Sequence, residues 1–111
     1  MAGEGQLEIR IQPGDAEGAG GGTVVRVAGE VDLATTPLLE DALSDALARS
    51  GPVTVDLAEV AFMDATGLGA LAGAADQARH QGLAFRLRTP SHPVRRLLSA
   101  TELVDALAIE D

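Results

Sequence analysis

The sequence predicts a single α/β domain in which a mixed sheet of four to five strands carries its helices chiefly on one face. Runs of alternating apolar and polar residues predict strands, and segments with apolar residues three and four positions apart predict helices. These elements follow in the order strand, strand, helix, strand, helix, strand, helix, strand. Single helices between strands imply right-handed crossovers that leave the helices on one face. The 111 residues, 46% of them hydrophobic, suffice for one core.

The composition excludes several classes of function. The chain has no cysteine, which excludes disulfides, thiolate metal sites and cysteine nucleophiles. Its net charge of −9 would repel a phosphate backbone, so we expect no nucleic-acid partner. The acidity either favours a basic protein partner or only confers solubility. Because no apolar run has the length of a membrane span and the first residues do not resemble a signal peptide, we expect a cytoplasmic protein without membrane insertion.

The first two strands flank a glycine-rich connection. The alternation from Leu7 to Gln12 predicts one strand, and a β-branched run from Thr23 predicts a second that continues to Leu33. Residues 13–22 between them have the composition of a flexible loop. A phosphate-binding loop would end in Gly-Lys-Ser/Thr before a helix, whereas this segment has no lysine and precedes a strand. We therefore interpret it as a hairpin loop.

The first helix is predicted to start at Thr36, with this residue as the N-cap and Pro37 in the first helical position. Ser50, Gly51 and Pro52 predict its end. Between these limits an apolar stripe at helical spacing is formed by Leu39, Ala42, Leu43, Ala46 and Leu47.

The central stretch, from Val53 to Gly82, changes from a strand to a helix near Met63. The predicted strand alternates at Val53, Val55 and Leu57 and continues through Val60 and Phe62. The predicted helix has an apolar face formed by Leu68, Leu71, Ala72, Ala75 and Ala78.

The start of this second helix has two candidate N-caps, Asp64 and Thr66, because either side-chain oxygen can accept from the free N–H groups of a first turn. Gly67 and Gly69 also lie in this turn. Glycine lowers helix stability by about 1 kcal/mol relative to alanine. Two glycines here therefore indicate close approach to the backbone, either by a neighbouring element or by a partner.

The remaining chain is predicted to form a strand from Leu83 to Arg88, a helix from about Pro93 to Ala100 capped by Ser91, and a short apolar strand in residues 104–109.

The sequence contains no arrangement typical of an enzyme. Asp32 and Asp64 could form a carboxylate pair, but two aspartates among 17 acidic residues are weak evidence for acid–base catalysis. No serine lies in a Gly-x-Ser-x-Gly elbow, and neither His80 nor His92 belongs to a cluster with metal-ligand spacing. We expect no catalytic residues, no metal and no cofactor.

The run from Val55 to Gly73, VDLAEVAFMDATGLGALAG, resembles the signature of the STAS domain, in particular that of the bacterial anti-sigma factor antagonists. In that family Asp-Ser-Ser/Thr-Gly-Leu-Gly opens a helix after a strand. The segment from Gly29 to Asp32 resembles the family's Gly-Glu-(Ile/Val/Leu)-Asp segment, whose aspartate lies near the phosphorylation loop. The resemblance spans about residues 7–109 and implies one STAS domain over residues 1–111.

The resemblance implies a protein that binds an anti-sigma factor, often a serine kinase, and so frees a sigma factor for transcription. It implies a partner-binding and regulatory loop formed by Asp32, Asp64, Ala65, Thr66, Gly67 and Leu68. The position that is usually phosphorylated in the family is Ala65 here, which has no hydroxyl.

Three interpretations of this alanine stay open. The domain is an antagonist that is always competent, it is phosphorylated at Thr66, or it is a STAS module with another partner, such as the accessory subunit of a lipid-transport ABC system. The second interpretation conflicts with a role of the Thr66 oxygen as N-cap, because that oxygen would already be engaged by the backbone.

Overall fold

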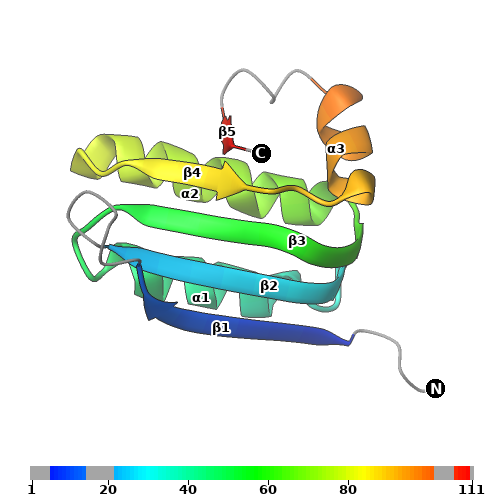
Figure 1. Ribbon diagram of the computed structural model, residues 1–111, viewed down its shortest axis with the longest axis horizontal. Helices are drawn as coiled ribbons and strands as arrows, with labels where there is room; N and C mark the ends of the chain where they lie inside the picture. Colours follow the sequence, from blue (N-terminus) through cyan, green and yellow to red (C-terminus); the bar gives the residue numbers. More distant parts are fainter. Residues whose placement is uncertain (1–5, 15–21, 102–106, 111) are drawn as a thin grey trace.

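The computed structural model describes residues 6–14, 22–101 and 107–110, and within these residues five strands form one mixed sheet (Figure 1). The strands lie side by side in the order in which they follow in the chain. The pair β1–β2 is antiparallel, and all later pairs are parallel. The bounds are Leu7–Pro13 for β1, Thr23–Val31 for β2, Val53–Met63 for β3, Phe85–Arg88 for β4 and Ala108–Glu110 for β5. The predicted mixed sheet is confirmed, with five strands.

Within the described ranges, three helices connect the parallel strands. They are α1 (Thr36–Leu47), α2 (Ala65–Gln81) and α3 (His92–Ser99). Figure 1 shows α1 and α2 behind the sheet on the same face, with α3 at the upper right, beyond the end of β4. This confirms the prediction of helices chiefly on one face. No helix in the described part of the chain is long and apolar enough to cross a membrane.

The core lies between the sheet and the two long helices. Valine side chains of β2 and β3 pack against leucine and alanine side chains of α1 and α2, which buries apolar surface from both layers. The fully buried large side chains are Leu39, Leu43, Leu47, Leu57, Leu68, Leu71, Leu87, Val25, Val27, Val31, Val53 and Val55. All five residues of the stripe predicted for α1 are buried.

Two irregularities interrupt the pairing of β3 with β2. Between the pairs Arg26–Asp56 and Ala28–Glu59, β3 contains one residue more than β2, and a second extra residue follows Val60. Such β-bulges reverse the face to which the following side chains point. At the first bulge the Asp56 carboxylate accepts a hydrogen bond from the Ala58 N–H over 3.0 Å.

The prediction that Phe62 is buried is wrong, and the second bulge is the reason. This side chain was predicted to continue the buried alternation after Val60. In the structure it is 48% exposed, and the next residue, Met63, is buried instead. The extra residue moves Phe62 from the core side of the strand to its surface.

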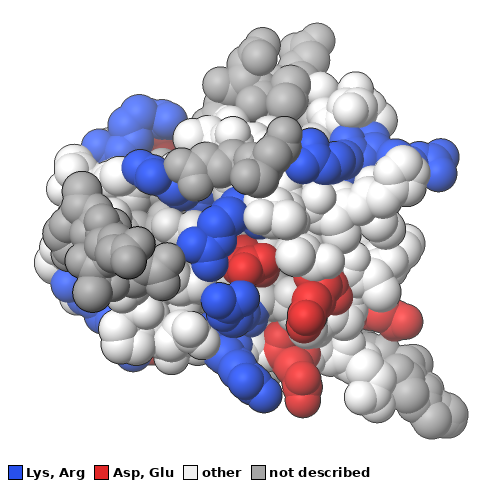
Figure 2. Space-filling view, in the orientation of Figure 1, with Lys and Arg blue, Asp and Glu red and all other residues white. Residues whose placement is uncertain are grey.

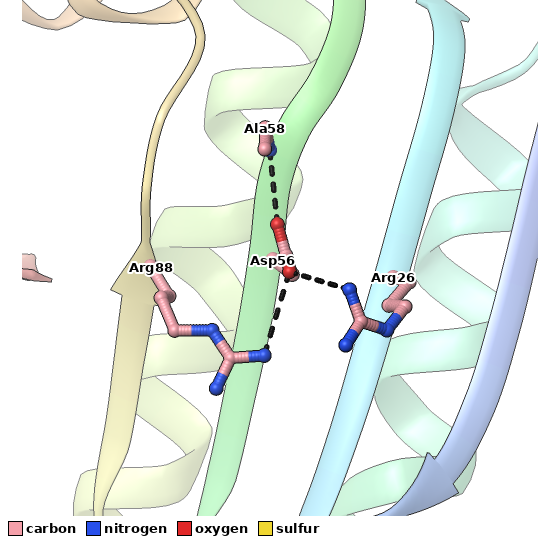
Figure 3. A network of polar contacts seen from close by, with 4 residues as sticks. All are labelled: Arg26, Asp56, Ala58 and Arg88. Atoms are coloured by element: carbon pink, nitrogen blue, oxygen red, sulfur yellow. Dashed lines mark hydrogen bonds and ion pairs between the residues drawn. The ribbon is translucent and has the colours of Figure 1, made fainter. Parts of the chain in front are cut away.

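The face of the sheet without α1 and α2 is polar. Figure 2 shows arginine and acidic side chains gathered on this face. Asp56 lies between two arginines of neighbouring strands, 2.8 Å from Arg26 on β2 and 3.4 Å from Arg88 on β4 (Figure 3). Its side chain is only 12% exposed, because the two guanidinium groups cover it. This ion triad joins the three central strands.

Several predicted boundaries need correction. The N-cap of α1 is Thr35, and Thr36 is already helical. In α2 Ala74 is buried in place of Ala72 and Ala75, which are half-buried. The fourth strand begins at Phe85 because the N–H of Leu83 donates to the Ala78 carbonyl at the end of α2 over 2.9 Å.

Two further predictions concern the cap of α3 and the segments that border residues outside the described ranges. Ser91 occupies the N-cap position of α3, but its side chain makes no capping hydrogen bond. Of the predicted loop 13–22, residues 15–21 lie outside the described residues, and so do residues 104–106 of the predicted final strand. The ends of the loop are joined by a hydrogen bond of 2.9 Å from the Gly14 N–H to the Gly22 carbonyl.

Candidate functional site

The C-terminal ends of β2 and β3 bring the two predicted aspartates to one edge of the sheet. Val31 and Met63 are the last paired residues of the two strands, and the Asp64 N–H donates to the Val31 carbonyl over 3.0 Å. Asp32 and Asp64 therefore begin adjacent segments. Ligand and partner sites of open parallel sheets commonly lie at such an edge.

Asp64 is the N-cap of α2, which decides between the two candidates. Its Oδ1 accepts from the Thr66 N–H at 2.9 Å, from the Gly67 N–H at 3.4 Å and from the Thr66 hydroxyl at 2.5 Å. The Thr66 hydroxyl bond is the main cause that lowers the pKa of Asp64 below its ordinary value of 3.8, and N–H groups of Thr66, Gly67 and Leu33 add to it against partial desolvation. The carboxylate is thus held in its charged form at the positive end of the helix.

Asp32 organises the turn that leads into α1. Its Oδ1 accepts from the Ala34 N–H at 3.0 Å and from the Thr35 N–H at 3.1 Å. The Thr35 hydroxyl, buried beneath the turn, donates to the Glu30 carbonyl over 2.9 Å. These bonds fix the path of the chain between β2 and α1.

A pair of threonine hydroxyls connects the two segments. The Thr36 hydroxyl lies 2.9 Å from the Thr66 hydroxyl, and it donates to the Asp32 carbonyl over 2.7 Å. The starts of α1 and α2 therefore meet at these two hydroxyls, which lie between the Asp32 carbonyl and the Asp64 carboxylate. The two carboxylates themselves bind separate donors.

The six predicted loop residues divide into surface and core. Ala65 and Thr66 are exposed, and Asp32 and Asp64 are half-buried. Leu68 is only 2% exposed and belongs to the core, so its side chain does not reach a partner. Gly67 is buried as well.

The two glycines of the first turn serve different needs. A Cβ atom on Gly67 would lie 2.6 Å from the Val31 Cγ1 atom and 2.9 Å from the Met63 Cγ atom, so Gly67 permits close packing of α2 on the ends of β2 and β3. A Cβ atom on Gly69 would meet nothing within 4 Å among the described residues. Close packing thus explains why glycine is needed at position 67. At position 69 the absence of a side chain leaves the helix backbone exposed.

Sequence reasoning missed the apolar side chains that surround this edge. The exposed large hydrophobic residues of the described chain are Leu33 (75%), Leu38 (54%) and Phe62 (48%), and they lie on the two segments that meet there. Leu33 follows Asp32, and Leu38 lies in the first turn of α1. Leu33 was predicted to end the second strand, but β2 stops at Val31 and Leu33 lies beyond it. Nothing in the sequence predicts the exposure of Phe62, which follows from the bulge in β3.

Phe62 also borders a shallow groove between β3 and α3. The groove is lined mainly by apolar atoms, and Arg96 lies at its side. Its lining residues are Phe62, Met63, His92, Pro93, Arg96, Leu97 and Ala100. The edge around Asp64 therefore continues as an apolar surface toward α3.

Residues 7–111 match the family described as the STAS domain. The chain belongs to the STAS domain family. The anti-sigma-B factor antagonist of Bacillus subtilis is 32% identical to this STAS domain over 85 residues, which cover 77% of this chain and 78% of the relative. The anti-sigma-B factor antagonist of Listeria monocytogenes is 37% identical over 86 residues, which cover 77% and 75%. The crystal structure of an anti-sigma factor antagonist from Mycobacterium paratuberculosis superposes with a TM-score of 0.75 at 26% identity, covering 99% of this chain and 90% of that one.

In this STAS domain the two aspartates of the site are engaged by donors of the chain itself. Asp32 accepts from donors of its own segment, whereas Asp64 accepts from the first turn of α2 and also interacts with the Leu33 N–H. Among the described residues, no group of three histidine, aspartate or glutamate side chains is placed to hold a metal ion. The exposed residues near this edge are Ala65 and Thr66 in the first turn of α2, together with Leu33, Leu38 and Phe62 on the segments that lead into α1 and α2.

Proposed function

We propose that this STAS domain is an anti-sigma factor antagonist, which binds an anti-sigma factor of the serine kinase type and so releases a sigma factor. The names of the curated relatives support this function, because those proteins match over three quarters of both chains. The observation that carries the proposal is the exposure of Leu33, Leu38 and Phe62 on the two segments that lead into α1 and α2.

The apolar residues supply the affinity in this proposal. Complete burial of a leucine or phenylalanine side chain contributes about 1.5–3 kcal/mol, and each of these three still has about half or more of its surface in contact with solvent. Binding energy at protein interfaces is concentrated in a few such anchors near the centre. Ala65 and Gly69 on α2 are exposed and have small side chains or none, which allows a partner to approach the helix backbone closely.

We infer further that the domain is competent without a phosphorylation switch. Ala65 has no hydroxyl, and the neighbouring Thr66 hydroxyl is engaged by Asp64 and Thr36. A phosphoryl group on Thr66 would add a charge of about −1.5 to −2 beside the Asp64 carboxylate, which would repel it. Both features oppose transfer of phosphate to this segment.

The binding surface is tested by an affinity pull-down from host lysate with ATP, using tagged wild type and Phe62→Ser, and by mass spectrometry of the captured proteins. We expect wild type to recover an anti-sigma kinase and the variant to lose it. Ala48→Ser, a polar change at the exposed far end of α1, is the matched control and should bind like wild type. Equal recovery by Phe62→Ser would contradict the proposed surface.

The absence of a switch is tested with the recovered kinase. Wild type, Ala65→Ser and Thr66→Val are incubated with kinase and ATP, and intact masses are measured. We expect only Ala65→Ser to gain a phosphoryl group and leave the complex. Phosphate on wild type that disappears in Thr66→Val would instead assign Thr66 as the acceptor. Recovery of a permease and an ATPase in the pull-down would replace the sigma-factor function by that of a lipid-transport accessory subunit.

A further inference from the structure

The strand β1 lies at the end of the sheet and has β2 as its single neighbour in the described part of the chain. It is seven residues long. Because no strand pairs with its outer side in the described chain, the backbone N–H and C=O groups on that side can pair with another strand. No described element lies along this edge, which is the lower border of the sheet in Figure 1.

The hydrogen bonds to β2 show which backbone groups point outward. Glu30 donates to the Gln6 carbonyl and Gly14 donates to the Gly22 carbonyl, so the even-numbered residues of this segment exchange bonds with β2. In an antiparallel pair, bonded and non-bonded positions alternate. Leu7, Ile9 and Ile11 consequently direct their N–H and C=O groups away from β2.

The side chains of β1 alternate in the same way. Leu7, Ile9 and Ile11 pack against the margin of the core and are still partly exposed. Glu8 and Arg10 are exposed on the open face of the sheet. The edge thus presents an apolar stripe on one side and two opposite charges on the other.

Arg10 makes no ion pair with a described residue, although it lines a hollow of the open face together with Glu8, Asp56 and Glu59. It lies directly opposite Arg26 on β2, and the guanidinium of Arg26 is paired with Asp56 (Figure 3). Like charges in opposite positions of an antiparallel pair repel each other. A carboxylate supplied from the outer side of β1 would relieve this repulsion.

We propose that β1 pairs antiparallel with β1 of a second copy of this chain, about a twofold axis at Ile9. In this register Leu7 lies opposite Ile11 of the second copy, and Glu8 lies opposite Arg10. The outward N–H and C=O groups of Leu7, Ile9 and Ile11 then bond across the axis. Glu8 and Arg10 fall in the non-bonded positions, where opposite side chains are closest.

The charges select this register among those that keep the apolar side chains on one face. A shift of two residues in one direction places Glu8 opposite Glu8, and the same shift in the other direction places Arg10 opposite Arg10. Both shifts replace attraction with repulsion. A shift of one residue would turn the apolar stripe of one copy to the polar face.

The pairing leaves both proposed partner-binding edges free. The Asp64 edge lies near the Leu7 end of β1, because Leu7 pairs with Gly29 and β2 ends at Val31. A twofold axis at Ile9 reverses the direction of the second strand. The two Asp64 edges therefore lie at opposite ends of the continuous sheet.

The test is sedimentation velocity of the full chain up to about 1 mM, a range that covers weak and transient interfaces. We expect wild type to associate reversibly to a dimer. Arg10→Glu and Glu8→Arg each change two attractive pairs into repulsive ones, and each should weaken dimerisation by about tenfold or more. An equimolar mixture of the two variants should form a heterodimer, because all pairs across the axis are then opposite in charge.

Arg49→Glu is the matched control for Arg10→Glu, since it makes the same change of net charge in an exposed residue after α1. It should dimerise like wild type apart from a small effect of net charge. Circular dichroism of each variant checks folding, and heterodimer formation by the mixture shows that both variants are folded. A monomeric wild type at about 1 mM would overturn the proposal, as would a mixture that stays monomeric.

Discussion

The hydroxyl of Thr66 donates a hydrogen bond to the carboxylate of Asp64 over 2.5 Å, within the first turn of the helix that Asp64 caps. The same hydroxyl oxygen lies 2.9 Å from that of Thr36 on α1. One side chain thus contributes to the charge state of the cap and to the contact between two helices.

Thr66→Val should lower the free energy of unfolding by about 1–2 kcal/mol, since it removes a hydrogen bond to a charged acceptor and leaves the Thr36 hydroxyl with one partner fewer. Urea denaturation measures the change. Thr54→Val is the control, because the Thr54 hydroxyl on β3 has no hydrogen-bond partner in the described part of the chain. Equal losses for both variants would show that the network around Thr66 is not stabilising.

The lowered pKa of Asp64 predicts a dependence of stability on pH. A carboxyl group with a lower pKa in the folded state contributes stability above its unfolded value, near 3.8, and this contribution is lost as pH falls through the folded pKa. We expect wild type to be more stable than Asp64→Asn at pH 7 and this difference to shrink below about pH 4. Thermal unfolding of both proteins between pH 3 and pH 7 measures it, and a constant difference would contradict the prediction.

Gly67 and Gly69 form a matched pair for substitution by alanine. Gly67→Ala should destabilise the fold by about 1–3 kcal/mol, because its Cβ would overlap Val31 and Met63. Gly69→Ala should instead stabilise it by up to about 1 kcal/mol, since the site is open and alanine favours the helix. Chemical denaturation of both variants gives the two signs. A destabilised Gly69→Ala would mean that this backbone position is not open.

Asp56→Asn should destabilise the domain by about 1–2 kcal/mol, because it removes the negative charge between Arg26 and Arg88 at a site that is only 12% exposed. Asp45→Asn removes one partner of the exposed pair with Arg49 and should cost about 0.3–0.5 kcal/mol. Urea denaturation at low and high salt compares them. If the two losses were equal, the central position of Asp56 would add nothing.

The sequence predicts best those features that depend on neighbouring residues. The cap at Asp64 and the apolar stripe of α1 arise within a few residues, so periodicity and side-chain chemistry identify them. The ambiguity between Asp64 and Thr66 disappears in the structure because Asp64 is the cap and Thr66 donates to it.

Features that depend on a second segment are not visible in the sequence. The exposure of Phe62 follows from the pairing of β3 with β2, which inserts an extra residue after Val60. The different roles of Gly67 and Gly69 depend on the place of Val31. The contact between Thr36 and Thr66 joins residues 30 positions apart. The position of the site at the ends of two strands can therefore be predicted from the sequence. The exposed apolar residues near it can be identified only from the tertiary structure.

The agreement between chain order and strand order has a consequence for folding during synthesis. Each described strand pairs with the one that emerged from the ribosome before it, and none is inserted between two neighbours that have already met. The β1–β2 hairpin offers the first template, and each later strand closes a loop of one crossover only. The topology therefore allows the domain to assemble from its amino end in step with translation, with β5 joining last.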